Sequence, residues 1–376
     1  MASTTTSLDY RIIMRVDLST IMVQNQHAVS LVPPKIHALY SCLSNDNFSD
    51  EVHLPFFKEP KAKSYNLEEL HKTTVTPNSE ANFVLNKVEK YIMEAEENVL
   101  QPHKNTATEK WQTQSKNKVK VFLCQRGILA DIMYILYGLT IKQYNEVTFY
   151  VTKYCGVFHM RDEIWTYNER ENYNRTFWQL CFPDNTDSDT TTDTPVNDLV
   201  YGIFKTVMKD FHLIYSAKIG GVISKHKNIN THDMDEINKL TFIETKLIKE
   251  NSFEDDILYH PKSFLWFLQG YLANIKHICV GVMDENHTVH TPVQVKQIKD
   301  ITKIREWRPD IYIGFLHTIL KLIEKTMRHV DCPYTVYEFR YVFTENCIKL
   351  KKHNGKSEQS FLSEDYIKKC KQYTTE

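Results

Sequence analysis

Residues 231–246 read THDMDEINKLTFIETK, and the rest of the chain can be interpreted outward from this acidic stretch. Asp233 and Asp235 stand two residues apart, and Glu244 and Lys246 repeat that spacing in a run of alternating apolar residues. Because a strand sends alternate side chains to opposite faces, each pair would share one face of its strand. Paired as a hairpin, the two segments would gather three carboxylates beside one ammonium.

Such a grouping has the composition of a site for metal-dependent cleavage of phosphodiesters. Hard oxygen ligands hold Mg²⁺ or Mn²⁺, and a nearby lysine steadies the phosphate or the attacking water. Taken alone, the spacing favours a plain solvated hairpin rich in aspartate and lysine. His232 has no second histidine at ligand spacing, which favours an exposed turn residue over a metal ligand. The metal interpretation therefore depends on the rest of the chain.

Composition and charge are those of an ordinary soluble protein. The chain has 376 residues, 42% of them apolar and 25% charged, which allows one large domain or two. The net charge of −1 creates no global field that would attract nucleic acid, so an RNA-binding surface must be a local patch. Eight cysteines without CxxC pairs indicate reduced thiols of an intracellular protein, and no apolar stretch is long enough to predict a membrane span.

Apolar periodicity predicts one α+β domain with a mixed sheet flanked by helices. Helices are predicted at 78–100, 128–137, 164–182, 197–211, 261–272 and 309–328. Strands are predicted at 119–124, 147–151, 157–160, 212–218, 222–224, 275–283, 288–295, 334–343 and 347–351.

The expected organisation has three parts. Residues 1–78 are interrupted by prolines and are expected to be an irregular segment packed on the core, and residues 79–351 are expected to form the single domain. Residues 184–197, DNTDSDTTTDTPVN, are small, polar and acidic, which predicts a flexible loop. Residues 352–376 are expected to be a polar tail.

Four segments between about residues 119 and 351 carry further motifs, and their order and spacing matter more than any one of them. They are LCQRGIL at 123–129, Asp-Met-Asp at 233–235, FIETK at 242–246 and SFLWFLQGYLANIKHICVG at 263–281. Read together, they resemble the decapping exonuclease (DXO) family, which trims defective five-prime ends of RNA with a nuclease core built on a mixed sheet. The corresponding family motifs are an Arg-Gly pair, Glu-hydrophobic-Asp, Glu-hydrophobic-Lys and a helix bearing Trp and Gln.

This resemblance implies the family's mixed-sheet fold, RNA five-prime ends as ligands and Mg²⁺ or Mn²⁺ as the cofactor of an active member. Carried over motif by motif, it implies catalytic roles for Lys246 and Gln269, RNA phosphate contacts for Arg126, Lys246 and Gln269, and metal ligation for Asp233, Asp235 and Glu244.

Departures from the family pattern fall on the metal ligands. The family has a further metal-binding glutamate at the end of a Gly-x-Lys-Phe-Glu motif, whereas the best match here is QLCFP at 179–183, which places Pro183 at that position. Asp233 is one methylene shorter than the family's glutamate, and the alternative register Glu236-Ile237-Asn238 keeps a glutamate but loses the aspartate. Because Mg²⁺ tolerates poor geometry badly, the missing carboxylate favours a site that has lost its metal.

The sequence therefore predicts a catalytically degenerate member of the family that binds or protects RNA five-prime ends. This prediction favours a pseudoenzyme over an active enzyme. Resemblance to a degenerate branch of the family implies a nuclear protein of the germline piRNA pathway and RNA-mediated silencing, with the Rhino and Deadlock chromatin proteins as partners. Two alternatives stay open. One is an active metal-dependent RNA decapping or five-prime-end hydrolase, and the other is a scaffold that binds only protein.

Each polar residue that matches a family motif also has an ordinary structural interpretation. Arg126 could pair with a surface carboxylate, although the glycine after it would let an RNA backbone come close. Gln269 could be a core-rim residue bonded to backbone, and Lys246 could form a simple ion pair with Glu244.

Overall fold

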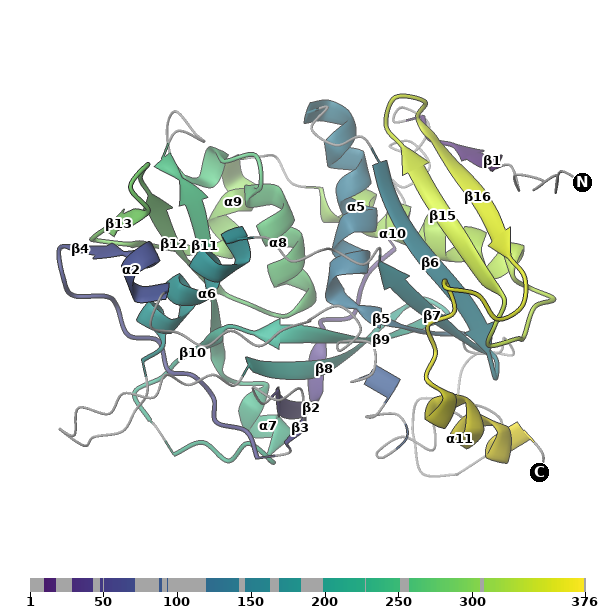
Figure 1. Cartoon of the computed structure of the whole chain (residues 1–376), viewed down its shortest axis with the longest axis horizontal. Coiled ribbons are helices and arrows are strands. Elements are labelled where there is room, and N and C mark those ends of the chain that lie inside the picture. The colour runs from purple at the N-terminus through teal and green to yellow at the C-terminus, as the bar shows by residue number, and fades with distance from the viewer. Residues whose placement is uncertain are drawn as a thin grey trace, which may run out of the picture.

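The chain folds around two β-sheets, as the computed structural model shows (Figure 1). The model describes residues 10–17, 29–42, 48–49, 51–71, 88–89, 93, 120–141, 146–162, 169–183, 199–226, 228–250, 257–304 and 308–374. Helices lie between and around the sheets, and both sheets contain parallel as well as antiparallel pairs. The predicted α+β class with a mixed sheet is confirmed.

Within the described residues the larger sheet has ten strands, drawn mostly on the right of Figure 1. In spatial order they are β1 (Arg11–Arg15), β16 (Cys347–His353), β15 (Val336–Val342), β6 (Glu146–Tyr154), β7 (Val157–Asp162), β5 (Lys120–Gln125), β9 (Phe211–Ile219), β8 (Leu199–Met208), β2 (Lys35–Cys42) and β3 (Phe48–Ser49). β5 runs parallel to both of its neighbours, and the other pairs are antiparallel.

The smaller sheet lies on the left of Figure 1 and contains the Glu-Thr-Lys segment. Its described strands are β10 (Gly221–Ile223), β11 (Thr241–Lys249), β12 (His277–Met283), β13 (Thr288–His290) and β4 (Ser64–Asn66), with β14 (Gln294–Gln297) also paired to β12. β11 has β10 as its antiparallel neighbour on one side and β12 as its parallel neighbour on the other.

Helices join and cover the two sheets. They are α2 (Leu67–His71), α5 (Arg126–Ile141), α6 (Glu169–Cys181), α7 (Met234–Ile237), α8 (Ser263–Leu272), α9 (Ile298–Ile304), α10 (Pro309–Thr326), α11 (Glu364–Thr374) and the 3₁₀ helix η2 (Ile257–Tyr259). No helix in the described ranges is long and apolar enough to cross a membrane.

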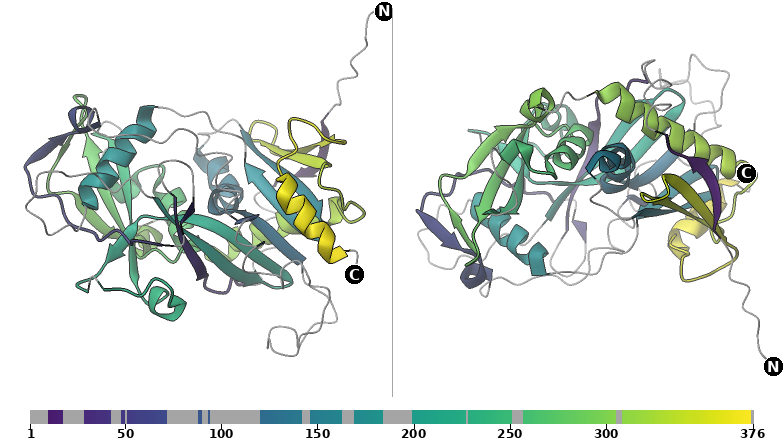
Figure 2. Two further views of the ribbon diagram at one scale, coloured as in Figure 1. Left: turned by 60° about the horizontal axis from the view of Figure 1, so that its bottom comes forward. Right: turned by 90° about the horizontal axis from the view of Figure 1, so that it is seen from above.

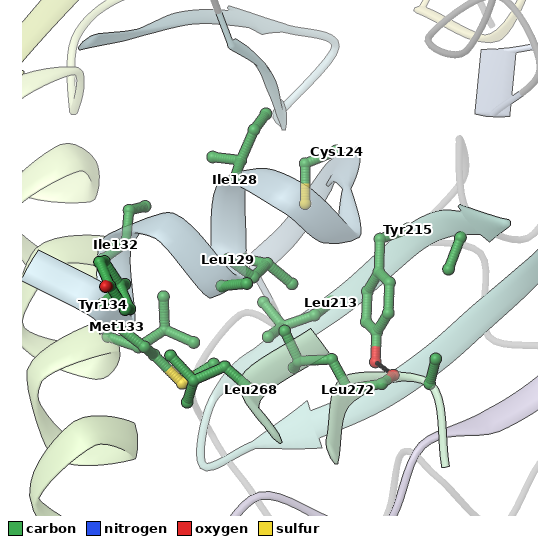
Figure 3. Close-up of a cluster of buried hydrophobic side chains, with 14 of the residues drawn as sticks. Cys124, Ile128, Leu129, Ile132, Met133, Tyr134, Leu213, Tyr215, Leu268 and Leu272 are labelled. Carbon is green, nitrogen blue, oxygen red and sulfur yellow. Dashed lines mark hydrogen bonds between the residues drawn. The ribbon is translucent and has the colours of Figure 1, made fainter. Parts of the chain in front are cut away.

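The core between the sheets is formed by α5 and α8, which lie side by side (Figures 1 and 3). Leu129 of α5, Leu213 of β9 and Leu268 of α8 are fully buried in the same cluster. The hydroxyl of Tyr215 donates a 2.6 Å hydrogen bond to the carbonyl oxygen of Leu272, which ties the end of α8 to the large sheet. This packing fixes the first residue of α5 next to α8.

The described parts of the two end segments contain more regular structure than the sequence predicts. Residues 1–78 were expected to be irregular, yet their described part contributes β1, β2 and β3 to the large sheet and β4 to the small one. The expected polar tail, 352–376, contains α11, whose Tyr366, Ile367 and Cys370 are buried. The predicted loop at 184–197 lies outside the described residues.

A further difference concerns residues 197–211, which were predicted to be helical. Residues 199–208 form β8, which pairs along its whole length with β9 and along most of it with β2. Nearly all of its side chains are buried on both faces. A strand buried on both faces has a continuous apolar run, which periodicity alone does not distinguish from a buried helix.

The C-terminal helix α11 packs against the β6–β7 hairpin of the large sheet (Figure 2). Tyr154 donates a hydrogen bond to the carbonyl oxygen of Ile367, and His159 lies 2.9 Å from the hydroxyl of Tyr366. At the start of the helix, the buried carboxyl of Glu89 accepts a 2.6 Å hydrogen bond from the hydroxyl of Ser363. Hydrogen bonds as well as apolar contacts therefore hold α11 on the sheet.

Glu89 should make the stability of this helix depend on pH. Burial raises the pKa of its carboxyl from 4.5 to about 7, against the opposing effect of the Ser363 bonds. Because the folded-state pKa is the higher one, the stabilisation is present below the unfolded pKa and is lost as pH rises through 7. The free energy of unfolding should fall by on the order of 2 kcal/mol between pH 5 and pH 8. Urea unfolding of the natural chain and of Glu89→Gln checks this, since equal pH dependence in both would contradict it.

Candidate functional site

Arg126 stands at the junction where β5 ends and α5 begins. Its Nη2 atom lies 3.2 Å from Oε1 of Glu244 in β11, and its Nη1 atom donates a 3.5 Å hydrogen bond to the carbonyl oxygen of Gln269 in α8. The buried β5 strand and the apolar α5 helix leave no freedom in the position of this junction. Three elements distant in sequence therefore meet at one guanidinium.

Glu244 and Lys246 share one face of β11, as their spacing predicts. The Nζ atom of Lys246 lies 3.1 Å from Oε2 of Glu244 and donates a 3.1 Å hydrogen bond to Oε1 of Gln269. Gln269 reaches this face because the buried residues of α8 fix the rotation of the helix. The structure thus brings together four of the predicted residues, Arg126, Glu244, Lys246 and Gln269, which we call the cation cluster.

The cation cluster is largely shielded from solvent and carries a net positive charge. The side chains of Arg126, Glu244 and Lys246 are 11%, 13% and 14% exposed. Burial would raise the pKa of Glu244, but the charges of Lys246 and Arg126 outweigh burial and hold that pKa at about 2. Burial lowers the pKa of Lys246, and Glu244 opposes this shift. Two cations and one carboxylate leave one positive charge.

The strand beside Glu244 brings no further carboxylate to the cluster. β10 pairs with β11 so that Val222 stands opposite Phe242 and Gly221 opposite Ile243. The next position, Gly220, therefore lies beside Glu244, where a Cβ would be 2.9 Å from the Glu244 Cα atom. On the face that carries Glu244, Gly220 just before β10 and Val222 within it are thus the neighbouring residues.

Asp233 and Asp235 do not form the predicted hairpin with β11. Residues 234–237 form the one-turn helix α7, and Oδ1 of Asp233 caps it by accepting hydrogen bonds from the backbone N–H groups of Asp235 and Glu236. Both aspartates are exposed. The strand expected at 233–235 is therefore wrong, because a capping aspartate favours a helix start at this position.

The end of α6 also supplies no metal ligand. The helix ends at Cys181, Pro183 is exposed, and the buried ring of Phe182 packs where a Cβ at Gly221 would lie, 2.2 Å away. The indole of Trp178 donates a 2.7 Å hydrogen bond to the carbonyl oxygen of Gly220. Aromatic side chains thus pack against the backbone of β10. Sequence reasoning missed this contact, although the Gly220-Gly221 pair inside a strand-like run was a signal for it.

A divalent metal does not fit the donor set of the cation cluster. Mg²⁺ requires near-octahedral oxygen coordination, usually with carboxylates from the protein. The described residues contain no group of three or more His, Cys, Asp or Glu side chains that could hold a metal, so Asp233, Asp235 and Glu244 do not meet. The oxygens of Glu244 instead face a guanidinium and an ammonium. The two cations and the amide of Gln269 are suited to an anion such as a phosphate.

Comparison with solved structures places the fold among those of the Rai1 and Dxo1 proteins. Candida albicans Rai1 in complex with pU5-Mn²⁺ superposes with a TM-score of 0.67 at 12% identity, over 97% of this chain and 100% of that one. S. pombe Rai1 gives 0.61 at 18% identity, over 87% and 96%. K. lactis Dxo1 in complex with manganese gives 0.53 at 10% identity, over 91% and 95%. At sequence identities this low, the structural similarity establishes a shared fold.

Two matches rest on the sequence itself. One is to protein cutoff of Drosophila melanogaster, 27% identical over 101 residues, and it spans only about a quarter of either chain (26% of each). The other is to the model of the RAI1 like PD-(D/E)XK nuclease family, which covers residues 33–367 and confirms the predicted family. The chain therefore belongs to the RAI1-like PD-(D/E)XK nucleases, the family that includes Rai1 and Dxo1.

Proposed function

We propose that this chain is a catalytically inactive family member that binds and shields the five-prime ends of RNA in the nucleus. One observation carries the proposal: among the described residues, the only carboxylate in the cation cluster is Glu244, and it is bound by Arg126 and Lys246. Cleavage in this family depends on a metal held by several carboxylates, whereas retention of a phosphate needs only the cations and the amide.

RNA is the ligand that the family context supports. The Candida albicans relative is described with pU5 and Mn²⁺, and the S. pombe relative with 3'-FADP, so both hold phosphorylated nucleotides. In this chain Arg126, Lys246 and Gln269 would contact the phosphates. Gly127, next to Arg126, has no side chain that would keep an RNA backbone away from the guanidinium.

The local match to cutoff supports a setting for this activity. We propose that the protein acts at piRNA clusters in the germline, where it protects precursor transcripts during transcription together with Rhino and Deadlock. Co-purification of both chromatin proteins with the tagged full chain from germline nuclei tests this part. If neither protein is enriched over an untagged control, the setting is wrong and RNA-end binding would remain to be judged separately.

The inactive state predicts that metal neither stabilises the protein nor supports cleavage. Five-prime-end-labelled RNA, capped, triphosphorylated or monophosphorylated, should keep its label when incubated with the natural chain and Mn²⁺ or Mg²⁺. The thermal unfolding midpoint should likewise not rise with Mn²⁺, because ligand binding to the folded state alone would raise it. Glu244→Gln serves as the matched control in both measurements.

Either alternative would be recognised in the same experiment. Label release by the natural chain that Glu244→Gln abolishes would show an active metal-dependent hydrolase, the alternative favoured by the contact between Lys246 and Gln269. Failure to retain any of the three RNAs, with no release, would favour a scaffold that binds only protein.

A further inference from the structure

The carboxylate of Glu244 occupies the place that an anionic ligand of the cation cluster would take. Its Oε1 atom faces Arg126 at 3.2 Å and its Oε2 atom faces Lys246 at 3.1 Å, so each oxygen contacts one cation. A phosphate bound by the same guanidinium and ammonium would present two of its oxygens in a similar way. Glu244 and the ligand therefore compete for the same donors.

We infer that Glu244 is an internal counter-ion that limits anion binding at the cation cluster and opposes ligands with two negative charges more strongly than ligands with one. The inference rests on the proposed function only in so far as the cluster must accept an anion. Two cations shielded to this degree need a negative partner when no ligand is bound, and Glu244 supplies it. The same carboxylate then weakens the binding of every anion at the cluster.

Charge decides which anion overcomes this competition. A phosphodiester inside an RNA chain carries one negative charge, whereas a terminal phosphate monoester carries about −1.5 to −2 at pH 7. With Glu244 in place the cluster has one positive charge, which attracts a monoester more than a diester, and without Glu244 the charge of +2 would enlarge this difference. Arg126 and Lys246 would thus favour an RNA end over an internal position of the RNA, and Glu244 would moderate that preference.

Inorganic phosphate is the probe that tests this without RNA. Thermal unfolding of the full chain is followed against phosphate concentration, with chloride at equal ionic strength as reference. The apparent Kd for phosphate should be roughly tenfold lower for Glu244→Gln than for the natural chain, because one repulsive charge within contact distance is removed. Glu236→Gln, which removes the charge of a half-buried carboxylate of α7, is the matched control and should leave the Kd unchanged.

Lys246→Met keeps the test valid if Glu244→Gln does not fold. This variant retains the Arg126–Glu244 pair, so the buried charges remain balanced, but the cluster has no net charge and should lose its response to phosphate. A Kd for Glu244→Gln equal to or higher than that of the natural chain would overturn the inference, as would an unchanged response in Lys246→Met.

RNA separates this inference from the proposed function. With five-prime-monophosphate and five-prime-hydroxyl forms of one RNA, Glu244→Gln should bind both more tightly and should widen the preference for the monophosphate. RNA binding by the natural chain that Glu244→Gln does not tighten would refute the counter-ion role while leaving the proposed function intact. If Glu244→Gln binds phosphate more tightly but no variant binds RNA, the counter-ion role would stand and the proposed function would be refuted.

Discussion

Gly220→Ala is expected to destabilise the protein by about 3 kcal/mol, because the backbone of the neighbouring strand leaves no room for a side chain. A Cβ at this position would lie 2.4 Å from the carbonyl oxygen of Ile243 and 2.9 Å from the Cα atom of Glu244. Both atoms belong to the backbone of β11, which cannot yield as a flexible side chain would. The hydrogen bond from Trp178 to the carbonyl oxygen of Gly220 would be disturbed as well.

Urea unfolding of the two proteins measures this difference. Gly127→Ala is the matched control, because the nearest described atom to its Cβ is Oδ2 of Asp162 at 3.7 Å. Alanine is also the better helix former, so this control should be neutral or slightly stabilising. Equal unfolding midpoints for Gly220→Ala and the natural chain would mean that β10 and β11 are further apart than the structure places them.

Arg126→Met is expected to weaken the binding of five-prime-phosphorylated RNA on the order of 30- to 100-fold, which corresponds to about 2–3 kcal/mol. Without the guanidinium, Lys246 and Glu244 remain as a neutral pair 3.1 Å apart, so the cluster loses both its net charge and its bidentate donor. The dependence of log Kd on log salt should also become shallower, by about one ion released.

Arg308→Met supplies the control for this measurement. Arg308 is exposed and pairs with Asp310 at 2.9 Å at the start of α10, so its loss removes one positive charge without touching the cluster. Fluorescence anisotropy at several salt concentrations would compare the three proteins. Similar losses of affinity in both variants would place RNA somewhere other than the cation cluster.

Local sequence rules were sufficient for part of the site. The period of two in a strand put Glu244 and Lys246 on one face, and the structure has them there. The motif order of the family brought Arg126 and Gln269 to the same place, although they are 143 residues apart. These predictions succeeded because each depends on the geometry of one element or on a fold that the family shares.

The predicted hairpin between residues 233–235 and β11 was wrong because it depended on strand pairing. Three residues, 233–235, are too few to show the alternation of apolar and polar residues that marks a strand. Asp233 instead caps a helical turn. The neighbour of β11 proved to be β10, whose Gly221 and Val222 stand opposite Ile243 and Phe242. Pairing between strands is a long-range contact, and no local pattern specifies it when one partner has three residues.

The close approach of β10 to β11 also bears on how this chain could change over time. A glycine codon can become a glutamate codon by one nucleotide substitution, so an acidic residue at position 220 is a near neighbour in mutational terms. The contact with the Ile243 carbonyl makes that step costly for folding, and Phe182 occupies the space next to Gly221 in the same way. An acidic side chain at either position would need the strand to move first, so selection on single substitutions would tend to preserve the two glycines.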